Sequence, residues 1–243
     1  MTLRVPVSAL SAGERALDHA TSRYLVKVHR SRVGEAFTAF DVDAGLEADA
    51  QLLSADPRAA RIRLGTPRPA PVTSPLPVTL LWAVGKADKP EAVIRDATAL
   101  GVRRIVLCTT ERTVVRLGER AEARRPRWQS VAREAARQSG RGDVPELVGP
   151  VSLAEALALG AGSVAMVLDP KAELTLAQVL APTPASTPLS VLIGPEGGLD
   201  DGELAAAAQA GFRAVRFGRL VLRTETAAVA VLGALLGLAD GRT

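Results

Sequence analysis

The chain has 243 residues, of which 47% are hydrophobic, and a net charge of +4, so it can bury one large core or two smaller ones. Its apolar runs fall short of the about 20 residues that a membrane span requires, and its charged N-terminal stretch does not resemble a secretory signal. A single cysteine excludes an intramolecular disulfide and fits a reducing cytoplasm, and with two histidines it is too little for the usual zinc site.

The N-terminal part of the chain carries short segments of alternating apolar and polar residues, separated by Gly34, Gly45 and Pro57. Such alternation, interrupted by turn residues, is typical of strands that bury one face. It predicts a small β-rich unit with strands at Leu3–Val7, Ala36–Phe40, Ala48–Leu52 and Ala60–Leu64. The segment Tyr24–His29 lies inside this unit, and we expect Leu25 and Val28 to pack inward.

Residues 66–77, TPRPAPVTSPLP, contain five prolines and no periodic pattern. A segment of this composition is extended and joins a core poorly. It therefore predicts a linker between the β-rich unit and the rest of the chain.

Beyond the proline-rich segment, strands and helices alternate. Apolar runs of strand length occur at Val78–Val84, Arg104–Cys108, Val164–Leu168, Leu189–Ile193 and Ala214–Phe217. Helices are predicted at Pro90–Leu100, at Trp128–Ser139, after the capping box Ser152–Glu155, and at Asp201–Ala210 with Asp200 as N-cap. This alternation predicts a parallel sheet with helices on both faces, in which Cys108 is an inert buried thiol.

The last predicted helix, Thr224–Leu238, is apolar nearly all round. A helix without a polar face must be covered on every side. A homodimer interface explains this composition, and a central core helix is the alternative.

Arginines are concentrated between Arg103 and Arg141, a stretch that contains eleven arginines and four acidic residues. Affinity for a polyanion grows with the number of phosphates neutralised, so this block indicates nucleic-acid binding. The alternative is a solvated helix face in an arginine-rich protein.

Two glycine-containing loops follow predicted strands. Gly194-Pro195-Glu196-Gly197-Gly198 comes directly after the strand that ends at Ile193, and Gly218 follows the strand that ends at Phe217. Ligands of parallel sheets bind at the carboxyl ends of the strands, and glycine lets main-chain groups approach a ligand closely. The alternative for the first loop is a tight strand-to-helix turn.

The segments LIGPEGG (Leu192 to Gly198) and FGRLVLRTETA (Phe217 to Ala227) resemble the motifs of the RsmE family of SPOUT RNA methyltransferases. The resemblance extends over nearly the whole chain. It implies an α/β fold class, with a PUA-like RNA-binding β-barrel at residues 1–70 and a SPOUT domain at residues 78–243 whose C-terminal part forms a trefoil knot. It also implies a homodimer that methylates N3 of one uridine in 16S rRNA of the small ribosomal subunit, without a membrane or a metal.

The same resemblance implies S-adenosylmethionine as cofactor. The binding residues that it carries over are Leu168, Ile193, Gly194, Pro195, Glu196, Gly197, Gly198, Phe217, Gly218, Leu222, Arg223, Thr224 and Ala227. RNA contacts are assigned to Arg30, Arg112, Arg133, Arg137 and Arg141.

Uracil N3 carries a proton, so its methylation calls for a general base or for a cation beside the developing anion. We assign anion stabilisation or phosphate placement to Arg223, and the base or the electrostatics around the sulfonium to Glu196 or Glu225. Alternatively, Glu225 caps its helix and pairs with Arg223.

The chain departs from the family pattern at Asp96, Ala99 and Arg137, where the family usually has Lys, Glu and Glu. These positions lie upstream of the cofactor loops, so they bear on the choice of target more than on methyl transfer. Two other functions stay open: a related enzyme that acts on a different rRNA or on tRNA, and a non-catalytic RNA-binding relic.

Overall fold

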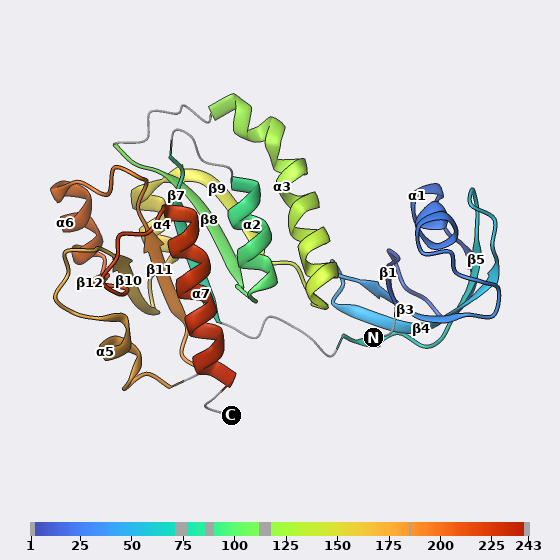
Figure 1. Cartoon of the computed structure of the whole chain (residues 1–243). Coiled ribbons are helices and arrows are strands. Elements are labelled where there is room, and N and C mark those ends of the chain that lie inside the picture. The colour runs from blue at the N-terminus through green and yellow to red at the C-terminus, as the bar shows by residue number, and fades with distance from the viewer. Residues whose placement is uncertain (1–2, 71–76, 86–89, 112–117, 185, 241–243) are drawn as a thin grey trace. The chain divides into compact units, whose positions relative to one another are not determined.

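The computed structural model describes residues 3–70, 77–85, 90–111, 118–184 and 186–240, coloured along the chain in Figure 1. The chain forms two compact units. The first contains Met1–Thr73 together with Arg133–Val144, and the second contains Ser74–Ala132 and Pro145–Thr243. The sequence analysis expected the chain to divide once, at the proline-rich segment. It did not anticipate that the later stretch Arg133–Val144 belongs to the first unit.

The first unit is built on a six-stranded sheet in the order β1-β3-β4-β5-β2, with β6 paired to β4. Only the β1–β3 pair is parallel. Its elements are β1 (Arg4–Pro6), β2 (Gly13–Ala16), α1 (His19–Arg23), the π-helical turn η1 (Tyr24–Val28), β3 (Ala36–Asp41), β4 (Leu46–Ser54), β5 (Arg61–Leu64) and β6 (Arg68–Pro69). All four predicted strands are present.

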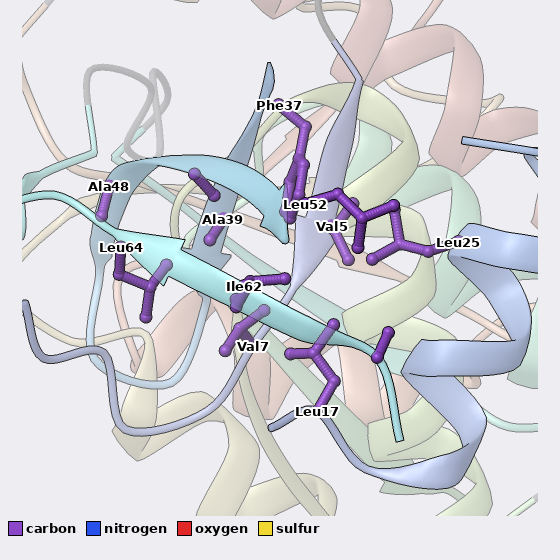
Figure 2. Packing of buried hydrophobic residues seen from close by; sticks show 12 residues of the cluster. Val5, Val7, Leu17, Leu25, Phe37, Ala39, Ala48, Leu52, Ile62 and Leu64 are labelled. Atoms are coloured by element: carbon purple, nitrogen blue, oxygen red, sulfur yellow. The ribbon is translucent and has the colours of Figure 1, made fainter. Parts of the chain in front are cut away.

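Alternate residues of these strands form the core of the first unit. Figure 2 shows side chains of β3, β4 and β5, among them Phe37, Leu52 and Ile62, converging with Leu25 of η1. Leu25 is fully buried as predicted, but the prediction for Val28 is wrong, since 68% of Val28 is exposed. The reason is that Tyr24–Val28 forms a π-helical turn with i→i+5 hydrogen bonds, in which residues three apart do not lie one above the other as they do in an α-helix.

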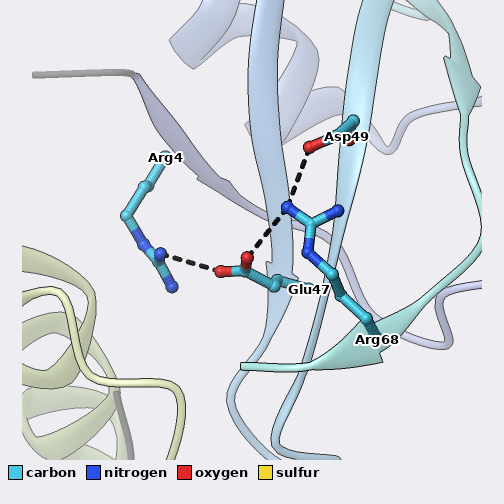
Figure 3. Close-up of polar contacts among 4 residues, drawn as sticks. All are labelled: Arg4, Glu47, Asp49 and Arg68. Carbon is cyan, nitrogen blue, oxygen red and sulfur yellow. Dashed lines mark hydrogen bonds and ion pairs between the residues drawn. The ribbon is translucent and has the colours of Figure 1, made fainter. Parts of the chain in front are cut away.

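A buried carboxylate binds the predicted linker to the first unit (Figure 3). Glu47 accepts from Arg4 at 3.0 Å and from Arg68 at 3.0 Å, and Arg68 also pairs with Asp49 at 2.9 Å. The Arg68 hydrogen bond to Asp49 lowers the pKa of that carboxyl group. Arg68–Pro69, predicted to lie in the linker, is therefore strand β6 of the first unit.

The second unit is a six-stranded parallel sheet in the order β12-β10-β11-β7-β8-β9. Its strands are β7 (Val78–Ala83), β8 (Arg104–Thr109), β9 (Glu146–Ser152), β10 (Val164–Leu168), β11 (Leu189–Ile193) and β12 (Arg213–Val215). The helices are α2 (Pro90–Ala99), α3 (Gly118–Ser139), which continues into the first unit, α4 (Leu153–Leu159), α5 (Leu176–Leu180), α6 (Asp201–Gln209) and α7 (Thr224–Asp240). The predicted parallel α/β sheet is confirmed.

Helices cover both faces of this sheet. One face packs Leu81, Val106 and Leu192 against residues of α4 and α6, such as Leu157 and Ala207. Alternate strand residues point to the other face, where α2 and α7 contact each other and α7 contacts β11 (Figure 1).

Helix α7 is covered on one side only within the chain. Ala228, Val231, Leu232 and Leu235 are buried, whereas Val229 is 38% and Leu238 is 43% exposed. Among the described residues, the alternative of a central core helix is therefore wrong, and part of the apolar surface of α7 stays exposed in the single chain.

Candidate functional site

The site predicted from the glycine loops lies at the carboxyl ends of three adjacent strands. β10 lies between β11 and β12, with Val167 opposite Leu192 and Leu168 opposite Val215. Because parallel strands end at the same edge of the sheet, Leu168 and the two loops that follow β11 and β12 meet there. Residues that are far apart in sequence are thus brought together as expected.

The loop after β11 is a tight turn with an exposed tip. The Gly198 N–H donates to the Pro195 carbonyl at 2.8 Å, and Gly198 has a φ of +69°, which favours glycine. A Cβ on Gly194 would lie 3.1 Å from Leu199 Cγ. Pro195 and Ile193 are buried, whereas Glu196 and Gly197 are exposed. The alternative of a strand-to-helix turn therefore explains Gly194 and Gly198, and Glu196 and Gly197 are left at the surface.

Helix α6 begins directly after this loop and is fixed by a buried glutamate. Asp200 caps α6 as predicted, and Glu203 Oε2 accepts from the Asp200 N–H at 2.9 Å. Glu203 Oε1 accepts from the N–H of Glu111, at the end of β8, at 2.8 Å. The sequence predicted the cap but not the second contact, because nothing local marks a pairing across 92 positions.

Beneath this cap, the thiol of Cys108 is buried in the sheet. Burial, and to a lesser extent the Glu203 carboxylate, raises the pKa of Cys108 to about 12. The predicted inert thiol is confirmed, since a protonated and buried sulfur is a poor nucleophile.

The loop after β12 is anchored at its start by α5, an element that the sequence did not predict. The Arg216 N–H donates to the Leu174 carbonyl at 2.8 Å, and the Leu176 N–H donates to the Arg216 carbonyl at 3.1 Å. Beyond this anchor, Gly218 has a φ of +73° and Leu222 is half-buried, as is Phe217. Leu220 and Val221 are 78% and 80% exposed.

Helix α7 begins directly after the loop that follows β12. The Ala227 N–H donates to the Arg223 carbonyl at 2.8 Å, and the buried Thr224 donates its hydroxyl to Glu225 Oε2 at 3.3 Å. In the part of the chain that the structure describes, the exposed Arg223 guanidinium forms no ion pair, so the alternative Arg223–Glu225 pair is not present. The loop after β11 thus carries the carboxylate Glu196, the loop after β12 carries the cation Arg223, and the first turn of α7 carries the carboxylate Glu225.

The arginines assigned to RNA differ in their surroundings. Arg30 is exposed, and Arg133 pairs with Asp43 at 3.2 Å on the surface. Arg137 pairs with Glu134, which raises the pKa of Arg137, and its guanidinium stacks 5.2 Å from the centre of the Tyr24 ring. Arg112 lies outside the described residues.

Arg141 requires a correction. It is 2% exposed, and its guanidinium binds both oxygens of Asp143, at 3.1 and 2.8 Å. A buried guanidinium that donates two hydrogen bonds to one carboxylate is not available to a phosphate. Arg141 therefore stabilises the turn after α3, and its assignment to RNA binding is wrong.

Two structural absences concern the described residues alone. Their helices include none long and apolar enough to cross a membrane. They also contain no group of three or more His, Cys, Asp or Glu side chains that could hold a metal ion.

A parallel α/β sheet with two glycine-containing loops at its carboxyl edge is compatible with a nucleotide-binding enzyme, and comparison with known proteins identifies its family. A family model described as an RNA methyltransferase domain matches residues 72–236, more than half of the chain, so the chain belongs to this family. Its relatives include the ribosomal RNA small subunit methyltransferases E of Mycobacterium bovis, 36% identical, and of Synechocystis, 33% identical. These matches confirm the resemblance to the RsmE family that the motifs indicated.

The match to the mycobacterial relative covers 65% of this chain and 62% of the relative. The match to the relative from Synechocystis covers 67% of this chain and 54% of the relative. The chain thus spans less than two thirds of the length of these relatives. Solved structures match over 98% of both chains: an RsmE of Neisseria gonorrhoeae bound to S-adenosyl methionine (TM-score 0.84, 29% identity) and a methyltransferase of Legionella pneumophila with the same bound cofactor (TM-score 0.83, 29% identity). They confirm the α/β fold class.

Proposed function

We propose that this protein transfers a methyl group from S-adenosylmethionine to N3 of one uridine in 16S rRNA. The observation that carries the proposal is the meeting of the two motif loops beside β10, at one edge of a parallel sheet. The names of the relatives support the reaction class, and the two solved structures with bound cofactor support the choice of cofactor.

The residues present fit such a cofactor. Gly197 and Gly198, in the loop after β11, and Gly218, in the loop after β12, expose main-chain groups that no side chain of their own covers. A Cβ atom placed on Gly198 or Gly218 would have no neighbouring atom within 4 Å, so both positions are open. Leu168, Phe217, Leu222 and Ala227 supply half-buried apolar surface between and beside these loops. Ile193, Pro195 and Thr224 are buried and act by holding the loops in place.

The cofactor supplies an electrophilic methyl group on a sulfonium. The work of the chain is to orient the uracil and to remove or neutralise the N3 proton, because the protonated nitrogen is a poor nucleophile. Arg223, without an ion pair among the described residues, is the group that stabilises the anion developing on the uracil oxygens. Glu196 or Glu225 accepts the proton, and Glu225 is the better fixed of the two because Thr224 donates to it.

RNA is held by the first unit in this proposal, through the exposed Arg30 and through Arg133 and Arg137, with Arg112 added from the sequence. Residues 1–70 act as the PUA-like RNA-binding module, and residues 78–243 form the SPOUT domain. The chain from β10 to α7 is threaded as a trefoil knot. The placement of β10 between the later strands β11 and β12 supports this threading.

The active form is a cytoplasmic homodimer. The exposed apolar side of α7, with Val229 and Leu238, supports this assembly because a second copy would remove it from water.

Two measurements test the proposed function. Calorimetry should detect binding of S-adenosylmethionine to the purified chain, and mass mapping of small-subunit rRNA from cells with and without the protein should show one methylated uridine that depends on it. Arg223→Gln should lower kcat more than cofactor affinity, because its cation acts on the developing anion. Absence of cofactor binding would sink the proposal, and loss of a methyl group from tRNA alone would redirect it to another target.

A further inference from the structure

The segment from Lys27 to Val33, which begins at the end of η1 in the first unit, presents two apolar side chains to water. Val28 is 68% and Val33 is 62% exposed, although both are branched aliphatic residues that usually pack inward. Arg30, also exposed, lies between them in the sequence. Neither valine contributes to the core of the unit.

The exposure of the valines does not come from a loosely held backbone. The His29 N–H donates to the Tyr24 carbonyl at 2.9 Å, the Ser31 N–H donates to the Leu25 carbonyl at 2.9 Å, and Ser31 is buried. At the far end, the Gly34 N–H donates to the Leu52 carbonyl of β4 at 2.7 Å. The segment is therefore fastened to the unit on both sides of Arg30.

Arg30 itself has a φ of +57°, a conformation that side chains other than glycine rarely adopt. Backbone strain of this kind persists where the surrounding structure enforces it, and it is often found at sites of function. The residue with this conformation lies between the two exposed valines, of which Val28 ends η1 and Val33 lies in the turn before β3.

Three of the four charged residues between Lys27 and Glu35 are cations. Lys27, Arg30 and Arg32 are exposed, whereas the nearby Glu35 uses its carboxylate to accept from the Arg32 N–H at 2.8 Å. His29 extends the surface, because its ring meets the edge of Tyr24 at 5.7 Å and Arg137 stacks on that tyrosine. Exposed apolar side chains that alternate with cations along the chain match an unpaired nucleotide, which offers a flat apolar base next to a phosphate.

We infer that Val28 and Val33, with Lys27, Arg30 and Arg32, form a docking surface for single-stranded RNA, in which the valines contact an unstacked base and the cations contact the flanking phosphates. The inference rests on the proposed function only for the identity of the natural RNA. It divides the work within the surface: the valines discriminate unpaired from paired RNA, and the cations supply affinity that depends on salt.

The test uses the full-length protein and a labelled RNA oligonucleotide of mixed sequence, either single-stranded or annealed to its complement. The double variant Val28→Ser/Val33→Ser should bind the single strand about tenfold more weakly, which corresponds to about 1.4 kcal/mol. Its salt dependence and its duplex affinity should stay as in the unmodified protein. Arg30→Gly removes one cation and relieves the strained backbone, so it should lower the slope of log affinity against log salt by about 0.7.

Leu159→Ser is the matched control, because Leu159 is an exposed aliphatic residue on α4 of the second unit, and it should leave RNA affinity unchanged. The isosteric pair Val28→Thr/Val33→Thr repeats the test with the side-chain shape preserved. Unchanged single-strand affinity in both double variants would refute the inference. Equal losses on single strand and duplex would refute it too, as would an altered oligomeric state with unchanged RNA affinity, which would assign the valines to a protein contact.

Cofactor binding, measured on the same samples, separates the two proposals. If the unmodified protein binds no S-adenosylmethionine but the valine variants still lose single-strand affinity, the proposed reaction fails and the docking surface stands. If the cofactor binds and the valine variants behave like the unmodified protein, only the docking surface fails.

Discussion

The two units of the molecule present their candidate sites by different means. At the edge of the parallel sheet, the second unit presents main chain: Gly197 is exposed, and Gly198 and Gly218 adopt left-handed conformations. The first unit presents long charged side chains, such as Arg30 from the segment between η1 and β3 and Arg133 from the C-terminal part of α3. A site made of backbone needs particular residue types at fixed positions, whereas a charged surface can be made from arginines at many positions.

This difference explains why motifs located one site and not the other. Arg133, Arg137 and Arg141 looked equivalent in the sequence, but the first lies on the surface, the second stacks on Tyr24, and the third is buried against Asp143. Charge composition does not distinguish these three environments, because each of them suits a guanidinium.

The largest expected effect separates two of these arginines. Arg141→Gln leaves Asp143 without its buried cation, and it should lower the free energy of unfolding by about 3 kcal/mol. Arg133→Gln breaks a surface pair, and it should cost less than about 1 kcal/mol while lowering the salt dependence of RNA binding. Urea denaturation and RNA titrations measure both effects. Equal stability losses in the two variants would remove the distinction.

A second comparison lies within the parallel-sheet unit, where α4 and α6 both begin with a capping box that a glutamate completes. Glu203 of α6 is buried and also accepts from the Glu111 N–H, whereas Glu155 of α4 is exposed and, among the described residues, accepts only from its cap residue Ser152. Glu203→Gln can replace only one of the two accepted hydrogen bonds, so it should lower stability by about 2 kcal/mol. It should also weaken cofactor binding, because α6 holds the loop after β11.

Glu155→Gln is the matched control and should lose much less stability, with cofactor affinity unchanged. Amide hydrogen exchange at Glu111 gives the most direct signal, since this N–H should exchange faster in the Glu203 variant alone. Unchanged protection at Glu111 would show that the long-range contact does not fix the loop.

Local sequence signals predicted the second unit well. β10 and β11 occupy the predicted residues, and the predicted caps at Ser152 and Asp200 are formed, because apolar runs and capping residues act over a few positions. The five-residue helix α5 was missed because it has only one turn of pattern, and β6 was missed because prolines obscured it. Val28 was misplaced because the local sequence does not mark a π-helical turn, which turns residues three apart to different faces.

The third prediction compares a glycine in the cofactor loop with a glycine outside it. Gly198 has a φ of +69° and Gly162, in the turn between α4 and β10 at the opposite edge of the sheet, has a φ of +79°, and neither has an atom within 4 Å of its Cβ position. Alanine should therefore cost each about 1 kcal/mol of stability through backbone strain. Only Gly198→Ala should also weaken S-adenosylmethionine binding, by about tenfold or 1.4 kcal/mol. Similar affinities in the two variants would show that main-chain freedom at Gly198 serves folding alone.

The smallest expected effect concerns the interior beneath this site. The folded pKa of Cys108 is about 12, raised mainly by burial, whereas a thiol in an unfolded chain titrates near about 8.5. Stability from this thiol is fully present below the unfolded pKa, and it is lost as pH rises through the folded pKa, because the unfolded state ionises first. From about pH 8 to about pH 9, the free energy of unfolding should therefore fall by about 0.7 kcal/mol more in the unmodified protein than in Cys108→Ala. If the free energy of unfolding fell equally with pH in the two proteins, water would reach the thiol. The contact between Glu203 and the Glu111 N–H would then not be the closed interior contact that holds the loop after β11.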